Sequence, residues 1–485
     1  MGGFFHIENF GCRAARADGE AIADRLRAAG LSECQPSLAD VVVVNTCSVT
    51  AEADREARAF IRRAHRLNPD ARIVATGCYA QRAHAELAAL GGVAAVVGNS
   101  HKAFAPEIAL NLIAPTAGRR ALAPRQPANG LIQIQAAQAE LAPPQVVLAD
   151  DRFAHSFLEE AQVLPGAQTR PNLKIQEGCS NRCTFCVIPQ TRGSSRSLPA
   201  ETILRQVQGF VAAGGNELVL SGINLGRWGR DLAASSDPDR PTLAGMVRKI
   251  IEQTDLLRLR LSSIEPMDWD SDLIALMAEF GGTRLARHAH LPLQSGSDTV
   301  LRRMHRRYRP WHYSDKVAAL LRAAGPDLTL GADVMVGFPG ETDSEFEETL
   351  GLIRALPFAY LHLFSFSPRP GTAAWELHAA APVPAAVVKE RMATLRVLEA
   401  QKSEAHRRRF LGRELDAITL NSPVSRTTRG CTSALSENFL PIEIADSVAA
   451  NRPIRVCVTG FASDGTLLAS QAACVPSPPA ELVAV

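Results

Sequence analysis

A short loop with three closely spaced cysteines most constrains what this chain can be. Cys179, Cys183 and Cys186 follow the spacing C-x3-C-x2-C, soon after the alternating apolar run at 173–175. Thiolates are the usual ligands of iron–sulfur clusters, and a [4Fe–4S] cluster needs one ligand for each iron. Three cysteines therefore leave one iron open to an outside ligand, which indicates chemistry at the cluster rather than electron storage alone.

A structural zinc site is the alternative for such a loop. Structural zinc usually takes four ligands, often as two Cys-x2-Cys pairs. No fourth Cys or His lies close to residues 179–186 in the sequence. The four-ligand rule therefore favours an iron–sulfur cluster over zinc.

Three further cysteines share a similar local context. Cys12, Cys47 and Cys78 each follow a predicted strand. In an open α/β sheet the carboxyl ends of the strands form the ligand crevice, so we expect these three thiols to converge on a second cluster site. The alternative is that each is a small buried hydrophobic residue, as single cysteines often are. The predicted strands span 4–7, 40–44 and 72–75.

The composition indicates a cytoplasmic enzyme. The chain shows no secretory signal at its start and no apolar run that approaches the ~20 residues of a membrane span, so we expect no membrane partner. In the cytosol thiols stay reduced, and clustered cysteines then indicate metal binding or catalysis. The net charge of +2 excludes a strongly polybasic protein, and 5% aromatic residues argue against broad base-stacking platforms.

The pattern of expected elements divides this α/β chain into five parts. Residues 1–103 alternate strand and helix, which predicts a small doubly wound domain. Residues 104–168 are rich in Ala, Pro and Gln and predict a linker. Residues 169–405 alternate strands and helices again, as in a partial or complete (β/α) barrel whose site lies at the carboxyl ends of the strands. Residues 406–472 predict a small β-barrel, and residues 473–485 a loose tail.

Longer motifs around these cysteines, and further motifs in the predicted barrel, resemble those of the radical S-adenosylmethionine (SAM) methylthiotransferases. Members of that family place an N-terminal cluster domain before a radical SAM barrel and end in a small RNA-binding β-barrel called TRAM. The resemblance covers nearly everything outside the linker and the tail. The matching motifs are Cys12, Val44–Thr50, Thr76–Gln81, Gly178–Cys186, Ser221–Gly226, Leu261–Pro266, His290–Ser297 and Val336–Glu341.

Within this family, the residues after Cys47 resemble the branch that acts on N6-threonylcarbamoyladenosine in tRNA. The chain has Ser48-Val49-Thr50 there, whereas the isopentenyladenosine branch has an Ile-Arg-type tail and the ribosomal-protein branch a Gly-Phe-Ile-type tail. The resemblance implies addition of a methylthio group to C2 of threonylcarbamoyladenosine at position 37. The alternatives are isopentenyladenosine in tRNA and an aspartate of a ribosomal protein. One departure is Ala15, where the family usually has Asn.

The resemblance also implies cofactors and partners. SAM would bind the open iron of the cluster on the 179–186 loop, and its reductive cleavage would give the radical that an unactivated adenine carbon requires. A second [4Fe–4S] cluster on the three N-terminal cysteines would supply sulfur, and a second SAM the methyl group. The expected partners are the anticodon stem-loop of tRNA and an electron donor such as flavodoxin or ferredoxin. A non-catalytic iron–sulfur carrier is the rival class, but a carrier needs no SAM pocket.

Five residues are assigned to SAM binding by the resemblance and by their place after strands. Phe185 is expected beside the adenine. Gly222 would let the backbone approach SAM closely, although an ordinary turn is the alternative. A helix cap is the alternative for Ser263 and Glu265. Gln294 lies on a similar loop.

Basic residues supply the predicted RNA contacts, because positive charge is the electrostatic footprint of nucleic-acid binding. The run at 302–307 is instead predicted to be a solvated helix face. Arg192 and Arg196 are candidates for a SAM carboxylate or an RNA phosphate. His290 and His362 are expected in the barrel interior rather than as metal ligands. The residues predicted to contact RNA are Arg407, Arg408, Arg409, Arg426 and Arg429.

Overall fold

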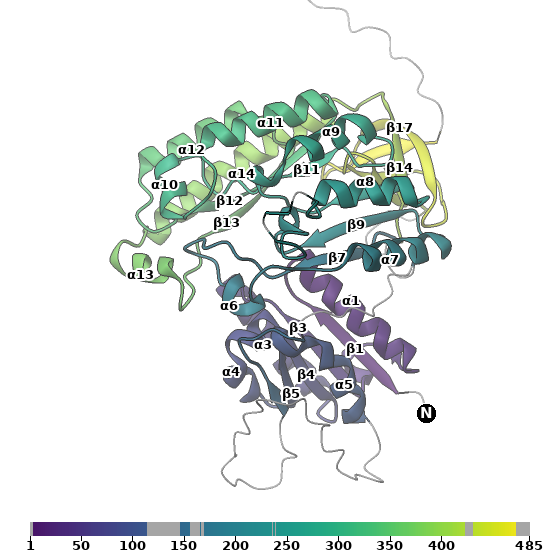
Figure 1. Cartoon of the computed structure of the whole chain (residues 1–485), viewed down its shortest axis with the longest axis vertical. Coiled ribbons are helices and arrows are strands. Elements are labelled where there is room, and N and C mark those ends of the chain that lie inside the picture. The colour runs from purple at the N-terminus through teal and green to yellow at the C-terminus, as the bar shows by residue number, and fades with distance from the viewer. Residues whose placement is uncertain are drawn as a thin grey trace, which may run out of the picture. The chain divides into compact units, whose positions relative to one another are not determined.

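The chain folds into two compact units, seen in the computed structural model of Figure 1. The first unit comprises Met1–Ala161 with Gln190–Gly193, and the second comprises Gln162–Pro189 with Ser194–Val485. No helix in the part of the chain that the structure describes combines the length and apolarity needed to cross a membrane. The structure describes residues 3–113, 146–155, 165, 169–234, 236–237, 239–421 and 430–471.

The first unit is a doubly wound α/β domain, as predicted. Its six-stranded parallel sheet has the order β2-β1-β3-β4-β5-β6. β3 is buried along its whole length, as expected for a parallel strand covered on both faces. Its side chains alternate between a core shared with α1 and α5 and a core shared with α2. The elements are β1 (Phe4–Asn9), α1 (Arg13–Ala28), β2 (Ser32–Glu33), β3 (Val41–Thr46), α2 (Ala51–Leu67), β4 (Arg72–Gly77), α3 (Cys78–Arg82), α4 (His84–Ala88), β5 (Val93–Gly98), α5 (Ala105–Ile113) and β6 (Val146–Leu148).

This unit extends past the boundary predicted at residue 103. α5 places Ala105 and Ala109 in the core, and β6 pairs with β5 as a further parallel strand. Both elements fall in the segment predicted to be a linker. The helix was missed because its buried residues are small, so its apolar stripe merges with the alanine-rich composition. Residues 114–145 of the predicted linker lie outside the described part of the chain.

The second unit begins with a partial (β/α) barrel. β7, β9 and β10 are parallel neighbours in one sheet, and β11, β12 and β13 are parallel neighbours in another. A bridge between Leu259 and Leu285 connects the two sheets. The short helix α6 (Ile188–Arg192) begins in this unit, but its residues from Gln190 on belong to the first unit. The other elements are β7 (Asn172–Glu177), β8 (Arg196–Ser197), α7 (Ala200–Ala212), β9 (Glu217–Gly222), α8 (Leu243–Gln253), β10 (Arg258–Leu261), α9 (Ser271–Phe280), β11 (His288–His290), α10 (Asp298–Arg303), α11 (Pro310–Ala324), β12 (Thr329–Val336), α12 (Asp343–Ala355), β13 (Tyr360–Ser365), α13 (Ala373–Ala380) and α14 (Ala385–Arg408).

A small closed β-barrel completes the second unit, as predicted, with the strand order β14-β15-β16-β18-β17. Phe410 is fully buried in its core with aliphatic residues from every strand. The helix α14 continues to Arg408, so the first residues assigned to this domain, 406–408, are helical. The strands are β14 (Glu414–Thr419), β15 (Thr432–Ser436), β16 (Pro441–Ile444), β17 (Pro453–Phe461) and β18 (Leu467–Ser470).

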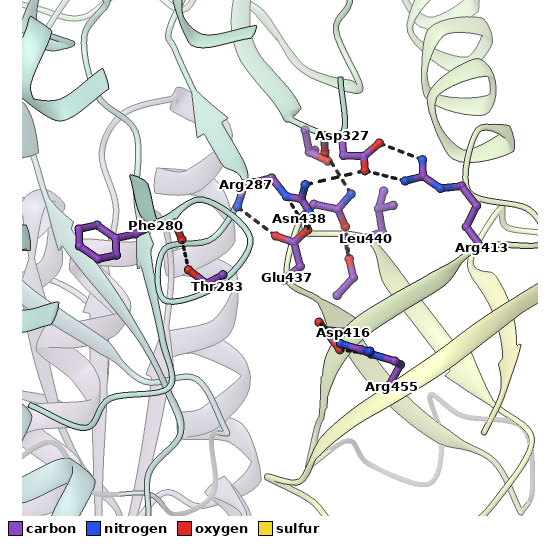
Figure 2. Close-up of polar contacts among 12 residues, drawn as sticks. Phe280, Thr283, Arg287, Asp327, Arg413, Asp416, Glu437, Asn438, Leu440 and Arg455 are labelled. Carbon is purple, nitrogen blue, oxygen red and sulfur yellow. Dashed lines mark hydrogen bonds and ion pairs between the residues drawn. The ribbon is translucent and has the colours of Figure 1, made fainter. Parts of the chain in front are cut away.

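Charged side chains fasten this small barrel to the (β/α) barrel. Figure 2 shows Arg287 between Glu437 and Asp327, with Arg413 reaching Asp327 from the other side. Arg287 Nε donates to Glu437 at 2.8 Å, and Arg413 makes two bonds to Asp327 at 2.9 and 2.7 Å. Two parallel bonds fix orientation as well as distance. The small barrel is therefore held in a defined position on the strands of the larger one.

His406 makes the stability of the second unit sensitive to pH. It is buried in the last turn of α14, with its Nε2 3.0 Å from Oγ1 of Thr329. Burial, followed by the charge of nearby Arg409, lowers its pKa to about 4, against roughly 6.5 for an unperturbed histidine. Below pH ~6.5 the unfolded chain binds a proton that the folded chain rejects until pH ~4, so stability falls as the pH falls through this window.

We therefore expect a His406→Gln variant to lose less stability on acidification than the wild type. The difference in unfolding free energy between pH 7 and pH 5 should shrink by about 2 kcal/mol. Urea unfolding of both proteins at each pH measures this change. An identical pH dependence in the two proteins would contradict the assignment.

Candidate active site: two sets of three cysteines

The first set of cysteines lies in the loop that follows β7. Contacts made by Thr184, inside this loop, anchor it to the chain after α10. The Thr184 amide donates to the carbonyl of Met304 at 3.2 Å, and its hydroxyl donates to the carbonyl of Arg303 at 2.9 Å. The loop is therefore held in place by strands and helices of its own unit.

Hydrogen bonds reach two of the sulfur atoms in this loop. Arg306 Nη1 donates to Cys183 Sγ at 3.3 Å, and Asn224 Nδ2 lies 3.5 Å from Cys179 Sγ. Arg306 is buried, and its Nη2 lies 2.6 Å from both carboxylate oxygens of Glu265. Donors of this kind stabilise thiolate ligands and tune the metal centre that they hold.

The donor set fits an iron–sulfur cluster better than zinc. Burial raises the pKa of Cys179, and it raises the pKa of Cys186 to about 12, so iron must displace protons when it binds. Among the described residues, three His, Cys, Asp or Glu side chains place their ligand atoms within 4.8 Å of one another at a single location. That location includes none of these cysteines. These three cysteines therefore do not form a compact three-ligand site for a single ion, whereas three thiolates are the number that a four-iron cluster with one open iron requires.

Gly222 ends β9 against Gln176 of β7. A Cβ at position 222 would come within 2.9 Å of Gln176 Cβ and Oε1, so the strand contact itself requires glycine. Gln176 Nε2 donates to the carbonyl of Gly178 at 2.8 Å, and its Oε1 accepts from the Asn224 amide at 2.7 Å. Gln176 thus joins the end of β9 to the start of the cysteine loop. Its position inside an alternating strand gave no sign of this role in the sequence.

The structure places the other predicted SAM residues near this loop or on the neighbouring strands. Phe185 packs edge-on against Phe338, with ring centroids 6.4 Å apart. Ser263 Oγ lies 2.7 Å from Nδ1 of His290. Gln294 has a positive φ of 64°, and its amide donates to the carbonyl of Asp333 at 2.7 Å. Glu265 is held by Arg306. Contact of these residues with SAM stays a prediction.

The second set of cysteines lies at the carboxyl ends of three adjacent strands in the first unit. Cys12 follows β1, Cys47 follows β3 and Cys78 follows β4. A Cβ on Gly11, which has a positive φ of 102°, would lie 2.8 Å from Cys47 Sγ, so only glycine fits there. Burial and the neighbouring Cys78 and Cys12 raise the pKa of Cys47 to about 12. Cys78 and Cys12 therefore lie close enough to Cys47 to act on its thiol, and a cluster shared by the three cysteines stays a prediction.

A buried charge network surrounds Cys78. Arg192 Nε donates to Cys78 Sγ at 3.2 Å, and its Nη1 donates to Asp18 at 3.1 Å. Lys102 Nζ donates to the same carboxylate oxygen at 2.6 Å. The three charged side chains are at most 1% exposed. The prediction that Arg192 meets a SAM carboxylate or an RNA phosphate is therefore wrong, because its guanidinium is enclosed with Asp18.

The described basic residues of the predicted RNA surface are partly engaged within the protein. Arg408 pairs with Glu404 one turn earlier on α14, and Arg409 donates to the carbonyl of Pro326 at 2.7 Å. The Arg407 guanidinium lies against Gly465, where an added Cβ would come within 2.5 Å of it. Arg426 and Arg429 lie outside the described residues. Their contact with RNA stays a prediction.

The basic run at 302–307 was predicted to be a solvated helix face, but one of its members, Arg306, is buried. α10 ends at Arg303, and His305 has a positive φ of 55° that reverses the chain. This reversal turns Arg306 inward while Arg302 and Arg307 stay exposed. Arg306 is therefore a site residue that the sequence analysis missed.

Replacing Arg306 tests the first site. We expect Arg306→Met to release iron to a chelator 10- to 100-fold faster than the wild type, by the usual effect of losing a partner of a metal ligand. The change removes the donor to Cys183 and leaves the Glu265 carboxylate without this cation. Arg302→Met, an exposed change in the same run, is the matched control and should keep the wild-type rate. Equal rates in the two variants would contradict the role of Arg306.

Replacing Asp18 tests the second site. Asp18→Asn leaves two buried cations without their carboxylate and should destabilise the first unit by about 3–5 kcal/mol, as expected when one partner of a buried ion network is removed. Urea unfolding followed by limited proteolysis of this unit measures the loss. Asp24→Asn, on the solvent side of the same helix, should change stability by less than about 0.5 kcal/mol. A stable Asp18→Asn protein would show that the network is dispensable.

The two units correspond to two known protein families. Residues 4–98 match a family described as Uncharacterized protein family UPF0004, and residues 173–353 match the Radical SAM superfamily. Among solved structures the chain is similar to the radical S-adenosylmethionine methyltransferase TsrM from Kitasatospora setae, with a TM-score of 0.49, 16% identity and 77% of each chain covered.

Curated relatives span nearly the same length. The chain is 38% identical over 371 residues to Threonylcarbamoyladenosine tRNA methylthiotransferase MtaB of Bacillus subtilis, covering 76% of this chain and 74% of that protein. It is 32% identical over 453 residues to the protein of the same name from Aquifex aeolicus, covering 93% and 99%. It is 34% identical over 423 residues to tRNA-2-methylthio-N(6)-dimethylallyladenosine synthase of Novosphingobium aromaticivorans, covering 85% and 86%. With a cysteine loop suited to SAM and a [4Fe–4S] cluster, this chain belongs to the radical SAM methylthiotransferase family.

Proposed function

We propose that this enzyme adds a methylthio group to C2 of N6-threonylcarbamoyladenosine at position 37 of tRNA, with SAM and two [4Fe–4S] clusters. The observation that carries the proposal is the second set of thiols. Cys12, Cys47 and Cys78 belong to the first unit and share no residue with the cysteine loop of the radical SAM unit, and a buried arginine donates to Cys78, which supports a second cluster on these three cysteines. A radical SAM enzyme that only abstracts hydrogen needs one cluster site, whereas sulfur insertion needs a source of sulfur.

The protein residues position the chemistry and do not perform it. When bound, SAM and a reduced cluster supply a radical that removes hydrogen from an unactivated carbon. Asn224 and Arg306 fix the sulfurs of Cys179 and Cys183 in the first set. In the second set, Arg192 and Asn99 both donate to Cys78 Sγ, at 3.2 and 3.3 Å. These donors offset the negative charge that thiolate ligands carry.

The residues after Cys47 support the threonylcarbamoyl branch, and their three side chains have different contacts and different exposure. Ser48 Oγ accepts a bond from Arg82 Nε at 2.7 Å, and Thr50 caps α2 by accepting from the Ala53 amide at 3.2 Å. Val49 is 51% exposed. Of the three, Val49 is therefore the side chain that a substrate can reach. Two curated relatives named for threonylcarbamoyladenosine match this chain over most of its length.

Isopentenyladenosine in tRNA is the second candidate, because a relative named for dimethylallyladenosine matches at 34% identity. An aspartate of a ribosomal protein is a third substrate class. The anticodon stem-loop would meet the basic residues at 407–409, and a flavodoxin or ferredoxin would deliver electrons to the clusters. These partners belong to the proposal.

Nucleoside analysis tests the substrate. The reconstituted enzyme, with SAM and a reductant, should convert threonylcarbamoyladenosine to its 2-methylthio form in tRNA from a strain that lacks methylthiotransferases, as measured by mass spectrometry. Isopentenyladenosine in the same tRNA pool should stay unmodified. Modification of isopentenyladenosine alone would contradict the proposal and show that the enzyme belongs to the isopentenyladenosine branch.

A cysteine variant tests the two-cluster chemistry. Cys47→Ala should abolish the methylthio product while SAM is still cleaved, because the cysteine loop of the second unit is untouched. Cys34→Ala is the control, since the Cys34 thiol bonds to the Gln35 carbonyl away from both sets. If Cys47→Ala still gave the methylthio product, the proposed sulfur-supplying role of this set would fail.

A further inference from the structure

A polar cluster outside both cysteine sets lies on one face of the β11–β13 sheet. Asp333 of β12 pairs in register with His362 of β13, and His290 of β11 pairs with Gly331, two residues before Asp333. Side chains two apart share a face of a strand, so His290, Asp333 and His362 project together. Residues of the opposite face of β12, such as Leu330 and Ala332, are fully buried and apolar. The polar cluster is therefore confined to one side of the sheet.

The bonding of His290 favours a cation at this cluster. His290 is 6% exposed, its Nδ1 lies 2.7 Å from Ser263 Oγ, and its buried Nε2 has no hydrogen-bond partner among the described residues. Nε2 nevertheless faces Asp333 Oδ1 at 3.4 Å. If Nδ1–H donates to Ser263, Nε2 presents a lone pair to a carboxylate. With that tautomer two acceptors face one another, and either a second proton on the ring or a bound cation between them would satisfy both.

The spacing of the three ligand atoms fits a metal ion. Asp333 Oδ1 lies 3.4 Å from His290 Nε2 and 3.6 Å from His362 Nδ1, and no two of the atoms are more than 4.8 Å apart. Ligands of a tetrahedral ion with bonds of about 2.0–2.1 Å lie roughly 3.3–3.4 Å apart. The nearest point equidistant from the three atoms, in the plane that they define, lies at most about 2.4 Å from each, so the side chains must draw together by a few tenths of an ångström to reach normal zinc bonds.

The surroundings resemble those of a catalytic metal site rather than a closed structural one. A ligating histidine usually has its second ring nitrogen fixed by a hydrogen bond, and Ser263 supplies that bond for His290. The Tyr360 ring stacks on His290, with centroids 5.9 Å apart. The His362 side chain is 57% exposed, so one side of the cluster is open. Two histidines and one carboxylate leave a fourth position for an oxygen ligand.

We propose that His290, Asp333 and His362 bind one divalent transition-metal ion such as Zn²⁺. The fourth coordination position of the ion is open to water or a substrate oxygen. This site contains none of the six cysteines, but it adjoins Ser263 and Gln294, two of the residues predicted to contact SAM. Ser263 is its positioning residue. The expectation that His290 and His362 only fill the barrel interior would then be incomplete, because Asp333 between them was not singled out in the sequence.

Zinc binding to the cluster-loaded full-length protein tests the proposal. After equilibrium dialysis against Zn²⁺ without oxygen, elemental analysis should give about one zinc per chain with no loss of iron. The zinc X-ray absorption spectrum should show nitrogen and oxygen neighbours at about 2.0–2.1 Å and no sulfur at ~2.3 Å. A sulfur shell would place the zinc on cysteines and overturn the proposal, as would the absence of bound zinc.

Variants of the ligands sharpen the test. Asp333→Asn and His362→Gln should each weaken zinc binding at least ~100-fold, and Ser263→Ala about 10- to 100-fold, as for other partners of metal ligands. Asp315→Asn and His312→Gln on α11 are the matched controls and should bind zinc like the wild type. His362 lies at an open edge, so its variant should fold normally, which circular dichroism checks. Unchanged zinc affinity in folded His362→Gln would overturn the site.

Discussion

Each set of cysteines depends on one buried arginine that is held by a carboxylate. Arg306, bound to Glu265, donates to Cys183, and Arg192, bound to Asp18, donates to Cys78. Three thiolates and an iron–sulfur core would bring negative charge into each site, next to side chains that are themselves buried. An isolated buried cation would be costly, and so would an isolated cluster of anions. Pairing the arginine with a carboxylate fixes the guanidinium before the cluster forms.

The same arrangement explains the backbone around the cysteines. Gly11 is required because a side chain there would collide with Cys47, and Gly222 is required because one would collide with Gln176. Gln176 in turn bonds to the residue before Cys179. The glycines, the strand ends and the buried polar residues therefore position the thiols together.

The fold and the cysteines could be predicted because both follow local rules. Buried parallel strands are continuous apolar runs in a sequence, so the strand predicted at 40–44 is found as β3, Val41–Thr46, and the cysteine that follows it was located at a strand end. Arg306 and Arg192 could not be identified as buried, because their environment is set by partners distant in sequence. A left-handed His305 turns Arg306 inward, and no glycine marks that turn. The partners Asp18 and Lys102 lie 84 residues apart.

We propose that the chain holds two iron–sulfur clusters on separate sets of three cysteines. Iron analysis with Mössbauer spectroscopy, on the wild type and on two triple Cys→Ala variants, tests it most directly. We expect about eight irons per wild-type chain and about four in each variant, since each set would hold one four-iron cluster. The variant of Cys12, Cys47 and Cys78 should keep the cluster that binds SAM. Iron unchanged from the wild type in that variant would contradict the claim.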